Sequence, residues 1–210
     1  MKERPILFSA PMVRAVLEGR KTQTRRVIKP QPVEPVMPAT SFGHHGLEVA
    51  FGPNNLMRNG GLRWWRCPYG QTGDRLWVRE TFRYDDYAPN EMIYQADCPA
   101  QAVKETKGII RWKPSIHMPR QVSRITMEIA GIRVERVQEI SEANAISEGT
   151  ERVGNLYKCY GECQDHESGH DKRSSAIASY MSLWDFINSK KPGCSWDDNP
   201  WVWVIEFWTC

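Results

Sequence analysis

Several stretches of the chain alternate between apolar and polar residues, which is the period of a β-strand. Residues 201–207 (WVWVIEF) are apolar on both faces, and this pattern predicts a central strand covered on two sides. Gly131 interrupts another alternating stretch, so we expect a bend or bulge there between two neighbouring strands. The predicted strands cover residues 5–8, 76–81, 92–95, 124–130, 132–137 and 201–207.

Helical periodicity marks three short segments. The first begins after Ser9, a favourable N-cap, and ends at Gly19. The second covers residues 140–149, with Ser141 as its N-cap and Gly149 as its stop. In the third, apolar side chains recur at helical spacing, and we expect this stripe to face the core. It comprises Ile177, Tyr180, Met181, Trp184 and Ile187.

Three long segments lack a clear period and are rich in proline, glycine or polar residues. We interpret residues 29–62, 83–120 and 154–175 as insertions in a single domain that spans residues 1–210. Residues 112–120 hold two prolines and predict a fixed loop. His44 and His45 lie in the first insertion, where they are either ligands or solvated loop residues.

Charge is unevenly distributed along the chain. Residues 1–30 carry eight Lys or Arg and two Glu, whereas the other 180 carry twenty basic and twenty-three acidic residues. The basic excess suits a phosphate-bearing ligand, or it is a solvated edge strand. No apolar run has the length of a membrane span, and we expect a cytoplasmic protein that has no membrane partner. Its six scattered cysteines are expected to be free thiols.

The basic residues gather in a strand-like segment after Gly19. Because alternate residues of a strand share a face, Thr24 and Arg26 are predicted to point one way, and Gln23 and Arg25 the other. Lys21 lies at the turn and is free of that alternation, so its side chain can still reach the Thr24 side.

This segment, Gly19-x-Lys21-x-x-Thr24-x-Arg26, resembles the signature of the ASCH domain family, a branch of the PUA-like β-barrels. Residues 72–78, 140–149 and 201–207 resemble further blocks of the family. The chain as a whole resembles the longer ASCH proteins of bacteriophages and prophages. The resemblance implies an α+β fold: a PUA-like mixed β-barrel with short flanking helices and long loop insertions.

Small ASCH proteins that share this pattern are amidohydrolases acting on N4-acetylcytidine. The resemblance implies Lys21, Thr24 and Glu148 as catalytic residues, no cofactor, and a nucleoside, nucleotide or RNA as partner. A lysine acts as a base beside a hydroxyl only if burial or nearby cations depress its pKa. Arg20, Arg25 and Arg26 are candidate cations. The alternatives are an RNA-binding module without chemistry and a ribonuclease.

Glu148 is expected at the C-terminal end of its helix, which disfavours a carboxylate unless a cation such as Lys21 is near. Glu80 is the alternative acid. Candidate substrate contacts, each of which is otherwise a structural residue, are Gly19, Arg20, Arg26, Trp64, Trp65, Glu80 and His117. Two cysteines and two histidines in the third insertion form either a zinc site or a polar loop: Cys159, Cys163, His166 and His170.

Overall fold

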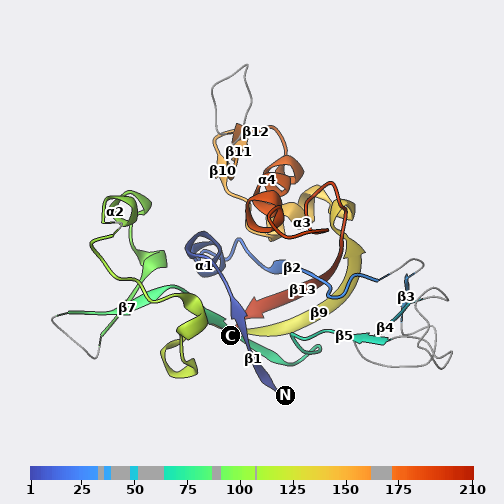
Figure 1. Ribbon diagram of the computed structural model, residues 1–210, viewed down its shortest axis with the longest axis horizontal. Coiled ribbons are helices and arrows are strands. Elements are labelled where there is room, and N and C mark those ends of the chain that lie inside the picture. The colour runs from blue at the N-terminus through green and yellow to red at the C-terminus, as the bar shows by residue number, and fades with distance from the viewer. Residues whose placement is uncertain (33–35, 39–47, 52–63, 87–90, 107, 162–171) are drawn as a thin grey trace.

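The fold is a mixed α+β architecture built on one five-stranded sheet (Figure 1). A computed structural model describes residues 1–32, 36–38, 48–51, 64–86, 91–106, 108–161 and 172–210. Its strands run in the order β1-β6-β9-β13-β2, with β1 parallel to β6 and the other pairs antiparallel. The bounds are β1 Glu3–Leu7, β2 Gln23–Val27, β6 Arg75–Arg79, β9 Thr126–Arg136 and β13 Trp201–Thr209.

β9 is one continuous strand, so the prediction of two neighbouring strands at 124–130 and 132–137 is wrong. The pairing of β9 is nevertheless irregular at Gly131, where the sequence predicted a bend or bulge. Glu206 of β13 pairs with Gly131, and the next residue, Phe207, pairs with Ile129. One extra residue, Ala130, is therefore accommodated on β9 as a bulge, which bends a strand without ending it.

β1 and β2 form the two edges of the sheet, and no described residues pair them as a ladder. The edges nevertheless approach one another, because Arg26 Nη2 on β2 donates to the carbonyl of Leu7 on β1 at 2.8 Å.

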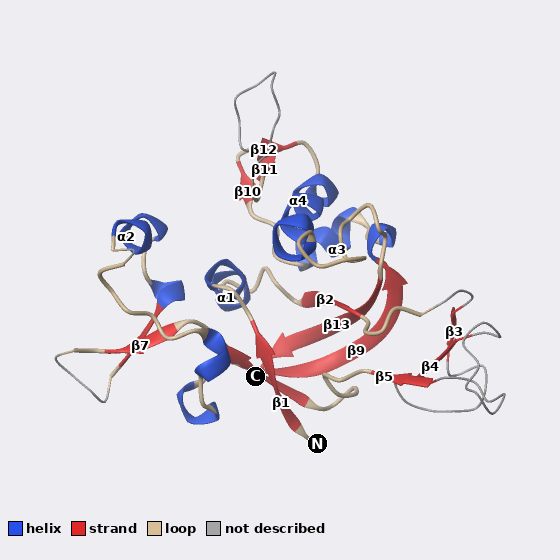
Figure 2. Ribbon diagram, in the orientation of Figure 1, coloured by secondary structure: helices blue, strands red, loops and turns tan. Residues whose placement is uncertain are grey.

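β13 is covered on both faces, which confirms the prediction of a central strand. Trp203, Ile205 and Phe207 belong to the larger hydrophobic cluster, together with residues of β1, β6, β9 and helix α1 (Ala10–Leu17). Val202 and Val204 belong to a second cluster with the helices α3 (Glu142–Ser147) and α4 (Ala176–Asn188), which lie beside one another in Figure 2.

The three predicted helices are present, and the apolar stripe on α4 is confirmed only in part. Tyr180 and Trp184 are buried, whereas Ile187 is 39% exposed. Ala176, Tyr180, Trp184 and Asn188 are buried at a spacing of four, and Ser179 is buried beside them, so the buried side of α4 includes polar residues that the apolar pattern did not mark. Ile187 lies beyond it, at the rim of the cavity described below.

The insertions contain short elements that the sequence pattern did not reveal. The first has two strands, β3 and β4, which pair with each other, and β4 also pairs with β5, so the interpretation of this insertion as a loop throughout is wrong. Residues 115–117 and 120–122 form single helical turns, each directly after one of the two prolines of the expected fixed loop. The remaining elements are β3 Val36–Pro38, β4 Glu48–Phe51, β5 Trp64–Arg66, β7 Phe82–Tyr84, β8 Met92–Tyr94, α2 Ala100–Glu105, β10 Arg152–Val153, β11 Leu156–Lys158 and β12 Lys172–Arg173.

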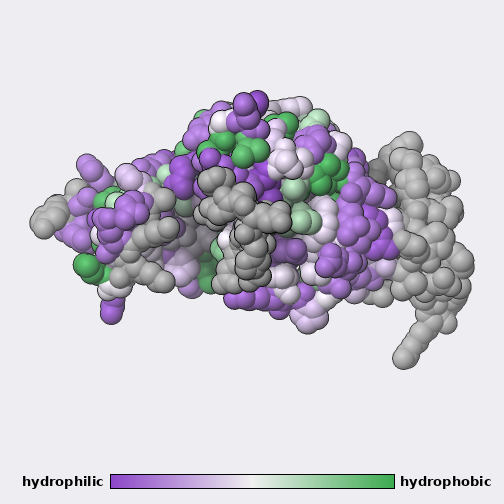
Figure 3. Space-filling view, turned by 90° about the horizontal axis from the view of Figure 1, so that it is seen from above, coloured by the Kyte–Doolittle hydropathy of each residue, from purple (hydrophilic) through white to green (hydrophobic). Residues whose placement is uncertain are grey.

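Within the described ranges, none of the helices has the length and apolar character needed to span a bilayer. The face seen in Figure 3 is mainly hydrophilic, with separate hydrophobic patches. Cys159 is disulfide-bonded, which corrects the expectation that all six cysteines are free. Four other cysteines are free thiols: Cys67, Cys98, Cys194 and Cys210.

Candidate functional site

The end of α3 brings Glu148 against the start of β2. Ser141 caps the helix by accepting a hydrogen bond from Asn144 N–H at 3.2 Å, as the sequence predicted. Gly149 ends it with a φ of 89°. A Cβ atom at this glycine would lie 2.9 Å from Ala15 Cβ and 3.0 Å from Lys21 Cβ. Only glycine allows the chain to turn this close to α1 and Lys21.

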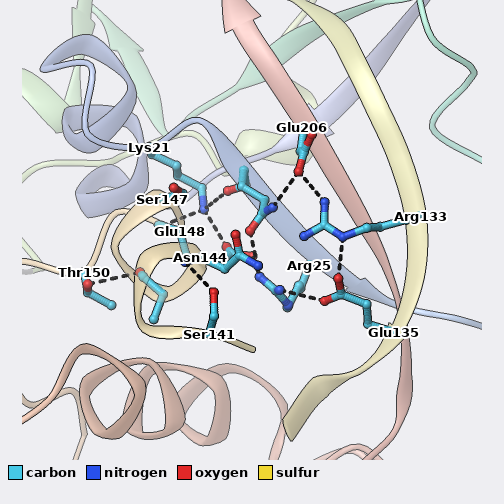
Figure 4. A network of polar contacts seen from close by, with 12 residues as sticks. Lys21, Arg25, Arg133, Glu135, Ser141, Asn144, Ser147, Glu148, Thr150 and Glu206 are labelled. Carbon is cyan, nitrogen blue, oxygen red and sulfur yellow. Dashed lines mark hydrogen bonds and ion pairs between the residues drawn. The ribbon is translucent and has the colours of Figure 1, made fainter. Parts of the chain in front are cut away.

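Lys21 is only 2% exposed, and its ammonium has three acceptors (Figure 4). Nζ lies 2.8 Å from the carbonyl of Gln23, 2.8 Å from the carbonyl of Glu148 and 2.9 Å from Glu148 Oε2. A lysine ammonium has three protons to donate, so this geometry satisfies all of them. The resting state is therefore a buried ion pair between Lys21 and Glu148.

Arg25 is the second cation on Glu148. Its Nη1 lies 3.1 Å from Glu148 Oε1 and 2.9 Å from Gln23 Oε1, and its Nη2 lies 2.9 Å from Glu135 Oε2. Each carboxylate oxygen of Glu148 thus has its own cation. Arg133 bonds both Glu135 and Glu206 and extends the network along β9 and β13 (Figure 4).

Burial lowers the pKa of Lys21 below its usual value. The charge and hydrogen bond of Glu148 oppose this effect, and the neighbouring Arg26 and Arg25 add smaller lowering contributions. Two of the three arginines proposed from the sequence therefore act as expected. The third, Arg20, instead contacts Glu18 at 2.7 Å and the carbonyl of Gly149 at 3.1 Å.

A cavity of about 530 Å³ opens beside this ion pair, within the size range of small-molecule sites. Thr24 and Glu148 both line it, whereas the contacts of the described residues include no hydrogen bond between Lys21 and Thr24. The predicted reach of Lys21 to the Thr24 side is thus not seen. The wall also has aromatic and basic side chains, namely Arg26, Lys29, Trp65, Arg66, Tyr69, Tyr180, Trp184, Lys191 and Trp203.

A second cavity of about 410 Å³ lies on the other side of Glu148. The two cavities adjoin, because both are lined by Ser9, Met12, Glu148 and the α4 residues Leu183 and Ile187. Arg20 lines the second cavity and not the first. Its guanidinium and that of Arg14 are held by protein acceptors there.

Most of the predicted contact residues near the signature do lie at the site. Arg26 and Trp65 line the first cavity, and Gly19 forms the positive-φ turn that precedes Lys21. The side chain of Trp64 lies outside the part that the structure describes.

Glu80 and His117 line neither cavity. The Glu80 carboxylate bonds Arg124 at 2.9 and 3.1 Å, and His117 is exposed. The structure therefore brings Glu148, not Glu80, to the signature.

The metal interpretation is not supported by the part of the site that can be seen. Cys163, His166 and His170 lie outside the described residues, as do His44 and His45. The thiol of Cys159 is used in a disulfide and is not a thiolate ligand in this structure. Within the described ranges, no three Cys, His, Asp or Glu side chains form a metal-binding group.

The sequence did not predict that Arg25 bonds the Glu148 carboxylate, and it predicted Tyr180 only as a core residue. The alternation of the signature strand did predict that Gln23 and Arg25 share a face, and their 2.9 Å hydrogen bond confirms it. No local signal shows that this face meets α3, which is about 120 residues away along the chain. Comparison of the chain with family models, curated proteins and solved structures finds no match.

Proposed function

We propose that this protein hydrolyses an amide on an N4-acylated pyrimidine of a nucleoside or nucleotide, with Lys21, Thr24 and Glu148 as its catalytic residues. The proposal includes membership of the ASCH family and its PUA-like fold. The observation that carries it is the pairing of a fully buried lysine with a carboxylate at the wall of a cavity of about 530 Å³. Such perturbed, paired groups beside a cavity are typical of functional sites.

The ion pair supplies both an acid and a base once a proton moves. Transfer of one proton along the 2.9 Å hydrogen bond from Lys21 Nζ to Glu148 Oε2 yields a neutral amine and a carboxylic acid. Burial and the charges of Arg26 and Arg25 lower the pKa of Lys21 and favour its neutral amine, whereas the charge and hydrogen bond of Glu148 favour the ammonium.

Hydrolysis then follows from these two groups. The Lys21 amine accepts a proton from water that the Thr24 hydroxyl orients, and the oxygen of that water adds to the acyl carbon. Collapse of the tetrahedral intermediate breaks the bond from the acyl carbon to N4, and Glu148 protonates the departing amine. The products are a carboxylic acid and the unmodified base, and the protein returns to its ion-paired state.

The shape and lining of the cavity suit a pyrimidine nucleotide. Trp65, Tyr69 and Trp203 provide aromatic surface, against which a base can pack. Lys29 and Lys191 line the same cavity and are exposed, so they can meet a phosphate at its mouth.

The direct test is to incubate the protein with N4-acetylcytidine and follow cytidine release by chromatography. Lys21→Met should lower the rate by about 10²- to 10⁴-fold, the usual contribution of a positioned acid or base. Lys190→Met is the matched control, because this exposed lysine lines neither cavity. Circular dichroism is needed beside the assay, since losing one partner of a buried pair costs about 3–5 kcal/mol.

Lys21→Arg separates the charge of the pair from its proton transfer. Arginine keeps the cation but does not lose its proton in proteins. A folded Lys21→Arg protein should therefore be as inactive as Lys21→Met. Full activity in either variant would contradict the mechanism.

The second candidate, RNA binding without chemistry, is favoured by the basic and aromatic lining just described. It predicts an affinity for RNA that falls steeply with salt concentration, because lysines and arginines that contact phosphates release counterions. Salt-dependent RNA affinity together with no cytidine release would favour this candidate over the hydrolase.

A further inference from the structure

We infer that Tyr180 is a further catalytic residue, whose hydroxyl donates a hydrogen bond to the acyl oxygen of the substrate. The inference rests on the proposed function and adds a group that the signature does not contain. Tyr180 comes from α4, more than 150 residues after Thr24, and lines the same cavity as Thr24 and Glu148.

The hydroxyl of Tyr180 is an unused donor in a buried place. The residue is 3% exposed, yet among the described residues its hydroxyl has no hydrogen-bond partner. Tyr180 lines the first cavity, so its unpartnered hydroxyl is available to a ligand that enters there.

The ring is held firmly by its neighbours. Its centroid lies 6.2 Å from the ring of Trp184 and 6.3 Å from that of Trp196, the latter in an edge-to-face arrangement. Arg25 Cζ lies 5.9 Å from the same centroid. A donor that is fixed before the substrate arrives needs no reorganisation when negative charge develops during the reaction.

The surroundings also keep the hydroxyl protonated. Burial raises the pKa of Tyr180 well above its usual value, and the nearby Glu148 raises it further. The phenol is therefore a neutral donor, suited to the acyl oxygen as that atom becomes an oxyanion. It neither gives up nor receives a proton in the step, and Glu148 remains the acid for the departing amine.

The test is the steady-state kinetics of Tyr180→Phe, which keeps the ring and removes only the oxygen. With N4-acetylcytidine, kcat should fall about 10²- to 10³-fold, as for removal of one oxyanion donor, while KM changes little. Tyr157→Phe is the matched control, because Tyr157 packs against the same hydrophobic cluster but lines neither cavity. Its kcat should equal that of the wild type.

The outcomes separate this inference from the proposed function. An unchanged kcat in Tyr180→Phe beside an active wild type overturns the role of Tyr180 and leaves the hydrolase standing. If the wild type releases no cytidine, the hydrolase fails, and binding of N4-acetylcytidine is measured by calorimetry. Binding about fivefold weaker in Tyr180→Phe, the loss of one hydrogen bond, keeps the hydroxyl as a ligand contact. Equal affinity, or no binding by the wild type, overturns the inference.

Discussion

Among the described residues, two glutamates are almost fully buried and paired with an arginine, but their surroundings differ. Glu148 is 4% exposed and Glu80 is 1% exposed. Glu80 bonds Arg124, which also bonds Asp97 at the surface, and none of the three lines either of the two cavities described above. Glu148 has a lysine as its second partner and lines both cavities.

The pKa values reflect a difference in the partners. At Glu80, burial outweighs the contribution of Arg124 and raises the pKa of the carboxyl. In the pair of Glu148 and Lys21, burial instead lowers the pKa of the lysine. Burial and pairing alone thus do not identify a functional carboxylate. A partner that can lose its proton, next to space for a ligand, is the feature that distinguishes Glu148.

The largest effect should come from exchanging each glutamate for its amide. Glu148→Gln removes the acid and should lower the rate of cytidine release about 10²- to 10⁴-fold. Glu80→Gln should leave the rate within about twofold of the wild type and cost about 1–3 kcal/mol of stability, through the weakened contact with Arg124. The checks are the chromatographic assay and urea unfolding. An inactive Glu80→Gln beside an active Glu148→Gln would reverse the comparison.

A smaller effect should follow from disturbing the position of Glu148 without touching its carboxylate. Gly149→Ala adds a Cβ close to Ala15 and Lys21 at a residue whose φ is 89°. We expect a loss of about 2–4 kcal/mol in the free energy of unfolding, from backbone strain and overpacking together. Gly154→Ala is the control, since its φ is 66° and a Cβ there would have no atom within 4 Å.

The control should therefore lose only the strain contribution, about 1 kcal/mol. Urea unfolding of both variants measures the difference. Equal losses would mean that the close approach of Gly149 to Lys21 does not matter for stability.

The smallest effect concerns a third carboxylate, Asp74, which holds the N-terminal segment. It accepts hydrogen bonds from Lys2 N–H at 2.7 Å and Arg4 Nη1 at 2.9 Å, and the first of these contributes most to lowering its pKa. The pKa of Asp74 is therefore lower in the folded protein than its ordinary value of 3.8. Asp74 contributes its full stabilisation at pH values above 3.8, and this stabilisation is lost as the pH falls below that value.

Asp74→Asn lacks this titration. Its deficit in unfolding free energy relative to the wild type should be about 1.5–3 kcal/mol near neutral pH and shrink below about pH 4. Urea unfolding between pH 3 and pH 7 gives the curve. A deficit that stays constant over this range would show that Asp74 acts through shape and not through charge.

Local structure near the signature was well predicted because short-range rules decide it. The N-cap at Ser141, the stops at Gly19 and Gly149 and the central position of residues 201–207 all follow from neighbours a few residues apart. The continuity of β9 was missed because a glycine within an alternating pattern indicates either a chain break or a bulge. Only pairing with the long β13 selects the bulge.

Sequence reasoning located the helices α1, α3 and α4, the central strand and the alternation that places Gln23 and Arg25 on one face. It also nominated Lys21, Thr24 and Glu148 through a resemblance. The folded structure was needed to show that Glu148 and not Glu80 meets Lys21, that Arg25 also bonds the Glu148 carboxylate, and that Tyr180 from α4 lines the same cavity as Thr24. These contacts join residues more than 100 positions apart in the sequence. They depend on how whole strands and helices pack against one another, which no local pattern encodes.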